Sequence, residues 1–277
     1  MPALRLSDAL ARLGMFAGPL PAPAPAGRFA RPEPPADLVA ALDALAPALR
    51  ARVLDPLGRD APSPVPGRPR TLSLPSDEGV VAPARQVDER TCGSAVLTML
   101  ALAGDPRQAL ELSRRPRGAA ASFAAAQRAL HARTTRGPGG LPAWPAGLGT
   151  PPWGAARVAR YGRVRYTHRV VGGRSAPQVL VAAAGAAAAG VPVPLYTGGD
   201  LSRGAATAVP RHVVLLTAVR GGLATLYEPS AGRLHAVPVA GLLAPGGPGS
   251  GARRLLAPAL GGWPHVVWAL LPRDARG

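Results

Sequence analysis

Residues 91–106 have the sequence TCGSAVLTMLALAGDP, which predicts a helix whose first turn carries the only cysteine of the chain. Apolar residues recur at helical spacing as far as Ala103, and a Gly-Asp-Pro stop follows. Thr91 is a residue type that caps helices, so we expect Cys92 at the helix N-terminus. Free N–H groups and the helix dipole stabilise a thiolate at that position.

A single cysteine has two interpretations, and its position alone leaves both open. Such a residue is more often a small buried hydrophobe than a nucleophile. Two other side chains favour the nucleophile. Gln86 lies six residues before Cys92, close enough for its amide to donate with the Cys92 N–H into an oxyanion hole. His212 opens an apolar run, where a rigid strand would hold an imidazole as a general base.

Residues 211–228, RHVVLLTAVRGGLATLYE, predict a β-hairpin whose outer ends carry His212 and Glu228. Acidic residues that could orient the histidine are scarce in the second half of the chain. Between Glu111 and Asp274 the sequence contains only Asp200 and Glu228. Glu228 is therefore the candidate partner of His212.

The length of the hairpin loop decides whether these two side chains can meet. A two-residue loop places Arg220 opposite Leu223 and puts His212 and Glu228 on opposite faces. A three-residue loop places Val219 opposite Leu223 and puts them on one face. The glycines of the turn favour the second register, but the sequence leaves both open.

The order of these segments resembles the papain-like cysteine peptidases, and among them the C39-like peptidase group. The resemblance covers about residues 84–243 and rests on short motifs: Gln86, Cys92-Gly93-Ser94-Ala95 opening a helix, Arg211-His212-Val213-Val214-Leu215 on a strand, Tyr227-Glu228-Pro229 followed by Gly232, and Gly190-Val191-Pro192-Val193-Pro194-Leu195 on the preceding strand.

The resemblance implies an α+β papain-like fold, with the cysteine helix packed on an antiparallel sheet that bears the histidine. It assigns the oxyanion donor to Gln86, the nucleophile to Cys92, the base to His212 and the orienting residue to Glu228. The chain departs from the group at Ser94, where proline is common, and at Glu228, where the group has Asp or Asn. The longer Glu must be set back or adopt another rotamer to reach the imidazole.

The implied activity is that of a thiol-dependent hydrolase that cleaves peptide or other amide bonds through a thioester. We expect a peptide or protein substrate and no cofactor. The same constellation also serves amidases and acyltransferases. The alternative is a catalytically degenerate papain-like domain that acts as a binding or scaffolding module, which predicts the same fold with a misaligned or buried thiol.

The composition excludes several other chemistries. All 32 basic residues are arginine, so Walker A loops and lysine Schiff bases are excluded. The net charge of +17 arises after residue 112. Such a field attracts nucleic acid, yet arginine in place of lysine is also what a GC-rich genome imposes, and an aromatic content of 4% argues against a nucleic-acid-binding role. The remaining histidines lack metal-ligand spacing, so we predict no metal site.

We expect two regions in the chain. Residues 1–79 form an N-terminal extension with two amphipathic helices, one of them over 38–53, and Pro-rich linkers; residues 80–277 form the papain-like domain. No signal peptide is recognisable, which favours the cytoplasm. Residues 179–196 lack charge, but their prolines predict a helix followed by a strand and no membrane span. Further predicted elements are helices at 119–133, 153–161 and 175–189 and strands at 164–171, 191–197 and 266–271.

Overall fold

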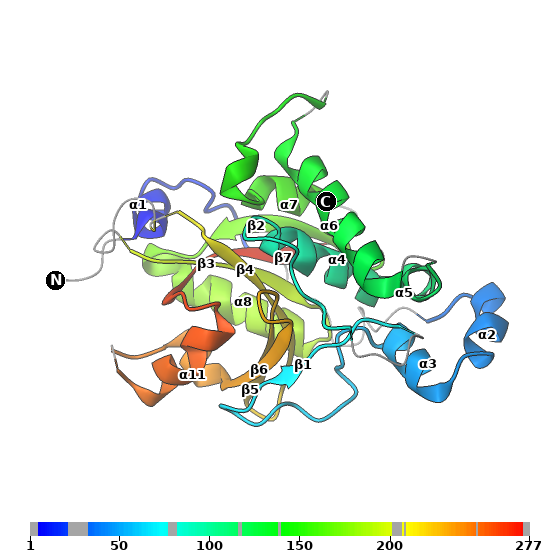
Figure 1. The fold of residues 1–277 in the computed structure, drawn as a ribbon. Helices are drawn as coiled ribbons and strands as arrows, with labels where there is room; N and C mark the ends of the chain where they lie inside the picture. Colours follow the sequence, from blue (N-terminus) through cyan, green and yellow to red (C-terminus); the bar gives the residue numbers. More distant parts are fainter. Residues whose placement is uncertain are drawn as a thin grey trace.

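The protein is described by a computed structural model that covers residues 5–21, 33–76, 82–115, 118–137, 140–200, 207, 209–247 and 249–273. Its centre is a seven-stranded sheet of order β1-β6-β5-β4-β3-β7-β2 (Figure 1). Every neighbouring pair is antiparallel. The strands are β1 (Arg70–Thr71), β2 (Arg165–Val170), β3 (Val193–Gly198), β4 (His212–Arg220), β5 (Leu223–Glu228), β6 (Arg233–Pro238) and β7 (His265–Arg273). The expected α+β class with an antiparallel sheet is confirmed.

Helices cover both faces of this sheet. They are α1 (Leu6–Arg12), α2 (Ala36–Asp43), α3 (Pro47–Leu54), α4 (Cys92–Gly104), α5 (Pro106–Ser113), α6 (Gly118–Thr135), α7 (Pro152–Val158), α8 (Ala176–Ala188), α10 (Val239–Leu243) and α11 (Gly251–Ala259), with 3₁₀ turns η2 (Ala146–Leu148) and η3 (Gly173–Ser175). Figure 1 shows α4, α6 and α7 on one side of the sheet and α8 and α11 on the other. The central strand β4 contacts both α4 and α8.

The cysteine helix agrees with its sequence signals at both ends. It begins at Cys92 and ends at Gly104, and the Asp105 side chain accepts hydrogen bonds from the first amides of the next helix, α5. Almost every residue of α4 is buried, because neighbouring helices cover it on the side away from the sheet. A helix that is apolar all round is expected to be enclosed in this way.

The loop of the β4–β5 hairpin is shorter than the three-residue loop that the sequence favours. Arg220 lies opposite Leu223, so the connection is the two-residue loop Gly221-Gly222. Both glycines have positive φ, 54° and 75°, as the tight hairpin turns that match strand twist require. The preference for a three-residue loop was wrong, because glycine suits either turn and its presence alone does not fix the loop length.

A β-bulge compensates for the short loop. The register shifts between Leu216 and Ala218, so Thr217 is an extra residue in β4. One extra residue moves every side chain on the far side of the bulge to the opposite face of the sheet. His212 and Glu228 consequently share a face, which the two-residue loop alone would forbid.

The N-terminal region packs into the same core as the rest of the chain. The helix expected over 38–53 is two helices, α2 and α3, because Pro47 starts a new helix after a break. Leu42 and Val53 belong to the apolar cluster that also contains the residues of α4. Strand β1 pairs with β6 at the edge of the sheet. The expected boundary between residues 79 and 80 lies outside the described residues.

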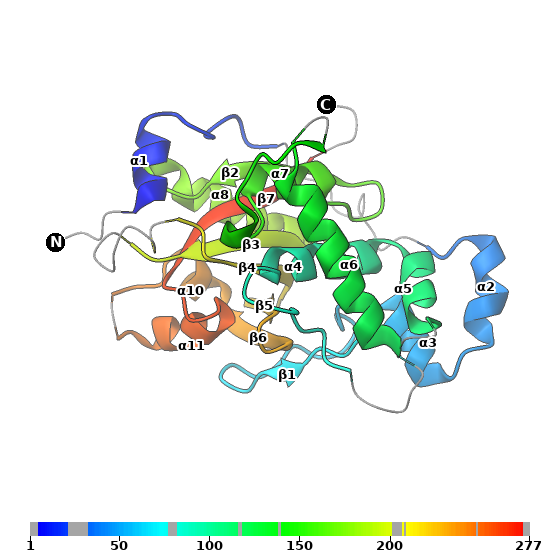
Figure 2. The same cartoon turned by 45° about the horizontal axis from the view of Figure 1, so that its top comes forward.

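Figure 2 shows the N-terminal helices at the two ends of the molecule, α1 beside β2 and α8 and α2 beside α5. The uncharged stretch 179–196 forms most of α8 followed by β3, as its prolines predict. In the part of the chain that the structure covers, no helix combines the length and the apolar character needed to cross a membrane.

Candidate active site

Cys92 is the first residue of α4 and is 4% exposed. Thr91 occupies the N-cap position, but its hydroxyl does not cap the helix. The Thr91 hydroxyl accepts hydrogen bonds from the N–H groups of Val87 and Asp88 and donates to the Asp88 carbonyl. It therefore fixes the loop before the helix. The first amides of α4 have no acceptor within the helix itself, so they remain suited to an anion.

Glu228 holds the imidazole of His212. The Glu228 Oε1 atom lies 2.8 Å from His212 Nε2. The same carboxylate accepts hydrogen bonds from the N–H groups of Ser230, at 2.8 Å, and Ala231, at 2.9 Å. The turn after β5 thus positions the longer Glu side chain. Because Nε2 donates to Glu228, Nδ1 is the nitrogen left for Cys92, which lines the same pocket as His212.

The electrostatics of the site favour an ion pair between His212 and Glu228. Burial lowers the pKa of His212, but hydrogen bonds and charge interactions with Cys92 and Glu228 outweigh it, so this pKa rises to about 9. Burial raises the pKa of Glu228, while the hydrogen bonds from His212, Ala231 and Ser230 lower it to about 2. At neutral pH Glu228 is therefore ionised and His212 protonated.

A close backbone approach fixes the imidazole from another side. Gly261 follows α11, and a Cβ atom built on it would lie 2.4 Å from His212 Cδ2 and 2.7 Å from Nε2. Its φ is +67°, which also favours glycine. The neighbouring Thr197 hydroxyl donates to the carbonyl of Leu260 and ties this segment to β3. The position of His212 therefore depends on a segment far from it in sequence.

Cys92 and His212 line a small pocket of about 60 Å³. One wall is formed by residues 147–150, which lie in the loop between α6 and α7. Thr150 of this wall packs against the start of α4 next to Ser94, at 3.4 Å between hydroxyl oxygens. Trp144 of this loop packs edge-on to Trp153 of α7, with ring centroids 5.1 Å apart. They anchor the loop and do not line the pocket.

Gln86 does not line this pocket. Its side-chain amide donates to the Asp88 carbonyl at 2.8 Å and accepts from the Ser230 hydroxyl at 3.2 Å. Its backbone N–H donates to the carbonyl of Pro229. The structure thus places Gln86 against the turn that holds Glu228, and an oxyanion role for its amide stays a prediction.

Sequence reasoning missed one polar side chain at the site, Tyr196. It lies on β3, lines the pocket with Cys92 and His212, and has a fully buried hydroxyl. A tyrosine within an apolar strand gives no signal of this kind, because only the pairing of β3 with β4 brings it next to the cysteine helix.

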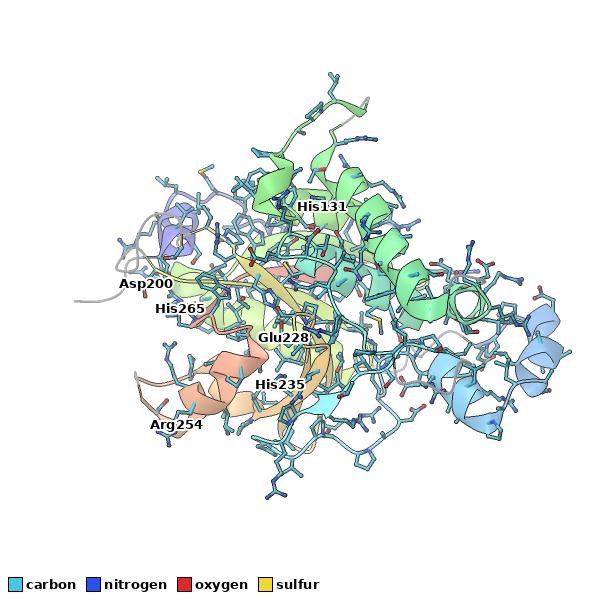
Figure 3. All side chains as sticks on the ribbon, in the orientation of Figure 1. His131, Asp200, Glu228, His235, Arg254 and His265 are labelled. Atoms are coloured by element: carbon cyan, nitrogen blue, oxygen red, sulfur yellow. The ribbon has the colours of Figure 1, made fainter. Side chains whose placement is uncertain are left out.

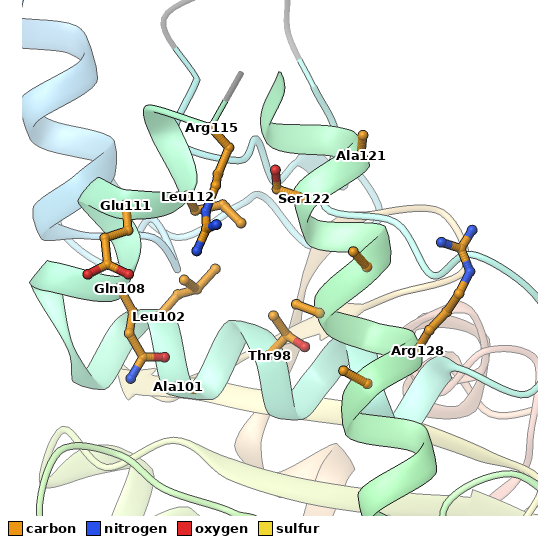
Figure 4. A pocket seen from close by; sticks show the side chains of 13 residues that line it. Thr98, Ala101, Leu102, Gln108, Glu111, Leu112, Arg115, Ala121, Ser122 and Arg128 are labelled. Atoms are coloured by element: carbon orange, nitrogen blue, oxygen red, sulfur yellow. The ribbon is translucent and has the colours of Figure 1, made fainter. Parts of the chain in front are cut away.

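Other parts of the molecule lack this combination of groups. A second histidine–carboxylate pair joins His265 and Asp200 at 3.5 Å. Figure 3 labels this pair well away from Glu228. The only cysteine, Cys92, shares a pocket with His212 and not with His265. A larger cavity of about 770 Å³ lies between α4, α5 and α6 (Figure 4) and shares no lining residue with the Cys92 pocket. Within the described ranges no three His, Cys, Asp or Glu residues gather as metal ligands would.

No family model, curated protein or solved structure matches the chain.

Proposed function

We propose that the protein is a papain-like, C39-like thiol hydrolase that cleaves peptide or other amide bonds through a thioester. One observation carries this proposal: the only cysteine of the chain begins a helix and lines one pocket with a histidine that a buried carboxylate orients at 2.8 Å. A nucleophile next to a base that a third residue orients is the arrangement that activates a thiol.

In the proposed reaction the Cys92 thiolate attacks an acyl carbon, and a sulfur–carbon bond forms while the carbonyl oxygen becomes an oxyanion. The intermediate collapses as His212 transfers its proton to the leaving amine. Water then attacks the thioester, His212 takes the proton from that water, and the acid leaves as the sulfur–carbon bond breaks and the Cys92 thiolate re-forms beside protonated His212. Glu228 keeps the imidazole in orientation and stabilises its charged form throughout.

A second candidate is a degenerate papain-like domain that binds a partner without cleaving it. The observations that favour it are the burial of Cys92, 4% exposed, and the small pocket above it. A domain of this kind would keep Cys92, His212 and Glu228 as structural residues and would give no covalent adduct with an acyl substrate.

Cleavage of a complex peptide mixture distinguishes the two candidates. The wild-type protein and Cys92→Ala are incubated with peptides from a digested proteome, and new termini are identified by mass spectrometry. The hydrolase predicts termini that appear with the wild type and are absent with Cys92→Ala. Identical peptide patterns for both proteins, with no acyl adduct on Cys92, would overturn it in favour of the binding module.

A further inference from the structure

The hydroxyl group of Tyr196 is buried without a hydrogen-bond partner among the residues that the structure describes. The residue is 1% exposed. Buried polar groups are almost always paired, and an unpaired one costs free energy of folding. A group retained at such a cost is expected to find its partner in a bound molecule.

Tyr196 lies next to the candidate active site in the β3–β4 pair. The residue lies opposite Val213 in the β3–β4 pair, and its neighbour Thr197 lies opposite His212. Tyr196 and Val213 both line the pocket that contains Cys92. Paired residues share a face and successive residues alternate, so this register places Tyr196 on the face of Val213, opposite to that of His212.

The electrostatic surroundings keep this hydroxyl group a donor. Burial raises the pKa of Tyr196 well above its usual range, and negative charge on Cys92 raises it further. The phenol therefore keeps its proton at neutral pH. It interacts with charge on the sulfur, yet it is not hydrogen-bonded to the sulfur.

We propose that the Tyr196 hydroxyl donates a hydrogen bond to the oxyanion that forms when Cys92 attacks an acyl carbon. This inference rests on the proposed hydrolase function. The oxyanion lies one C–O bond beyond the carbon that the sulfur has attacked, so its donor must be near the sulfur without being bonded to it. The N–H at the start of α4, where Cys92 lines the same pocket, supplies the second donor.

In this arrangement Tyr196, and not Gln86, supplies the side-chain hydrogen-bond donor to the oxyanion. The Gln86 amide is hydrogen-bonded to Asp88 and Ser230 and lies outside the pocket lining. Tyr196 belongs to that lining, and its hydroxyl has no other partner among the described residues. As the sulfur–carbon bond forms, the carbonyl π electrons move to oxygen and strengthen the hydrogen bond from Tyr196. When the oxyanion collapses, the bond to the leaving group breaks and Tyr196 retains its proton.

Two reagents applied to Tyr196→Phe separate this role from thiol activation. Acylation by 4-nitrophenyl acetate forms a tetrahedral oxyanion and releases 4-nitrophenolate. Alkylation by iodoacetamide displaces iodide from a saturated carbon and forms no oxyanion. We expect Tyr196→Phe to slow acylation by about 10²- to 10³-fold, the usual effect of losing one oxyanion donor. The alkylation rate and its pH profile should remain those of the wild type.

Tyr166→Phe is the matched control. Tyr166 is equally buried, but its hydroxyl donates to the carbonyl of Pro192 at 2.8 Å and lies outside the pocket lining. Tyr166→Phe should lower the thermal unfolding temperature and leave both reaction rates unchanged. Tyr196→Phe should leave the unfolding temperature unchanged or raise it, because the lost hydroxyl has no partner in the folded protein.

Each contrary outcome identifies what has failed. An unchanged acylation rate in Tyr196→Phe overturns the inference. An equal loss of acylation and alkylation also overturns it, because the hydroxyl would then act on the Cys92 thiolate and not on the oxyanion. A selective acylation loss in Gln86→Ala alone would return the role to Gln86. A wild-type protein that reacts with neither reagent would instead overturn the hydrolase proposal itself.

Discussion

At the scale of single residues, the site depends on how the His212 ring is held. Glu228 engages Nε2 at 2.8 Å, and the backbone at Gly261 approaches the same edge of the ring. The hydrogen bond to Glu228 and the close glycine backbone together fix the ring. Glu228 is in turn fixed by the N–H groups of Ser230 and Ala231. Charge and close backbone packing together determine the direction of Nδ1.

Gly261→Ala should displace the imidazole and reduce thiol reactivity. A Cβ atom would lie 2.4 Å from His212 Cδ2, a distance that forces a shift. We expect the iodoacetamide alkylation rate at pH 7 to fall on the order of 10- to 100-fold, since a misplacement of about 1 Å can have such an effect.

Gly262→Ala is the control for this substitution. Gly262 also has a positive φ, +85°, but a Cβ atom there meets nothing within 4 Å. Both variants carry a similar backbone penalty of about 1 kcal/mol, while only Gly261→Ala collides with His212. Equal alkylation rates for the two variants would show that Gly261 does not position the ring.

Some of these residues could be identified from the sequence, and others could not. Cys92 and His212 stand at the ends of strongly patterned segments, so their placement followed from local signals. Glu228 followed from the scarcity of acidic residues. Gly261 and Tyr196 gave no signal, because their relation to the site depends on tertiary contacts between segments distant in sequence.

At the scale of elements, the β4–β5 hairpin shows why it is hard to predict which face of a sheet a side chain occupies. Its two strands and its Gly-Gly turn are evident in the sequence, yet the loop has two residues and Thr217 is a bulge. Either feature alone would put His212 and Glu228 on opposite faces of the sheet. The Thr217 hydroxyl donates to the Thr225 carbonyl at 3.1 Å across the bulge. No local pattern marks such a bulge, so only the structure fixes the register.

The approach of α4 to the pocket wall gives a prediction at this scale. A Cβ atom at Gly93 would lie 2.7 Å from the Cβ atom of Thr150. Gly93→Ala should push the wall at residues 147–150 away from the helix, destabilise the fold by about 1–3 kcal/mol and lower the alkylation rate. Chemical denaturation and alkylation at pH 7 measure the two effects.

Gly185→Ala provides the comparison within α8. A Cβ atom at Gly185 meets nothing within 4 Å. Alanine in an open helical position stabilises by about 0.5–1 kcal/mol relative to glycine, so this variant should gain stability and keep the wild-type alkylation rate. A Gly93→Ala protein as stable and as reactive as Gly185→Ala would mean that the close packing of α4 on the wall does not matter.

At the scale of the whole molecule, the buried charges of the site couple folding to pH. The pKa of His212 is raised to about 9 from 6.5, so its contribution to stability is complete below about pH 6.5 and is lost as the pH rises through 9. The pKa of Glu228 is lowered to about 2 from 4.5, so its contribution is present above about pH 4.5 and is lost as the pH falls through 2.

Stability should therefore be greatest between about pH 4.5 and 6.5 and decline toward pH 9, by an amount on the order of 3 kcal/mol at most. Urea unfolding at a series of pH values measures this decline. His212→Ala should flatten the alkaline side of the profile and leave the acid side less affected. An alkaline decline of the same size in His212→Ala would assign it to other groups.

The most direct test of the central claim is the pH dependence of Cys92 alkylation by iodoacetamide in the wild type and in His212→Ala. An ordinary cysteine loses its reactive thiolate below about pH 8.5. The Cys92–His212–Glu228 arrangement predicts that wild-type alkylation persists well below that pH and that His212→Ala slows it there. A wild-type thiol that reacts as a free cysteine does, unaffected by the loss of His212, would contradict an activated nucleophile.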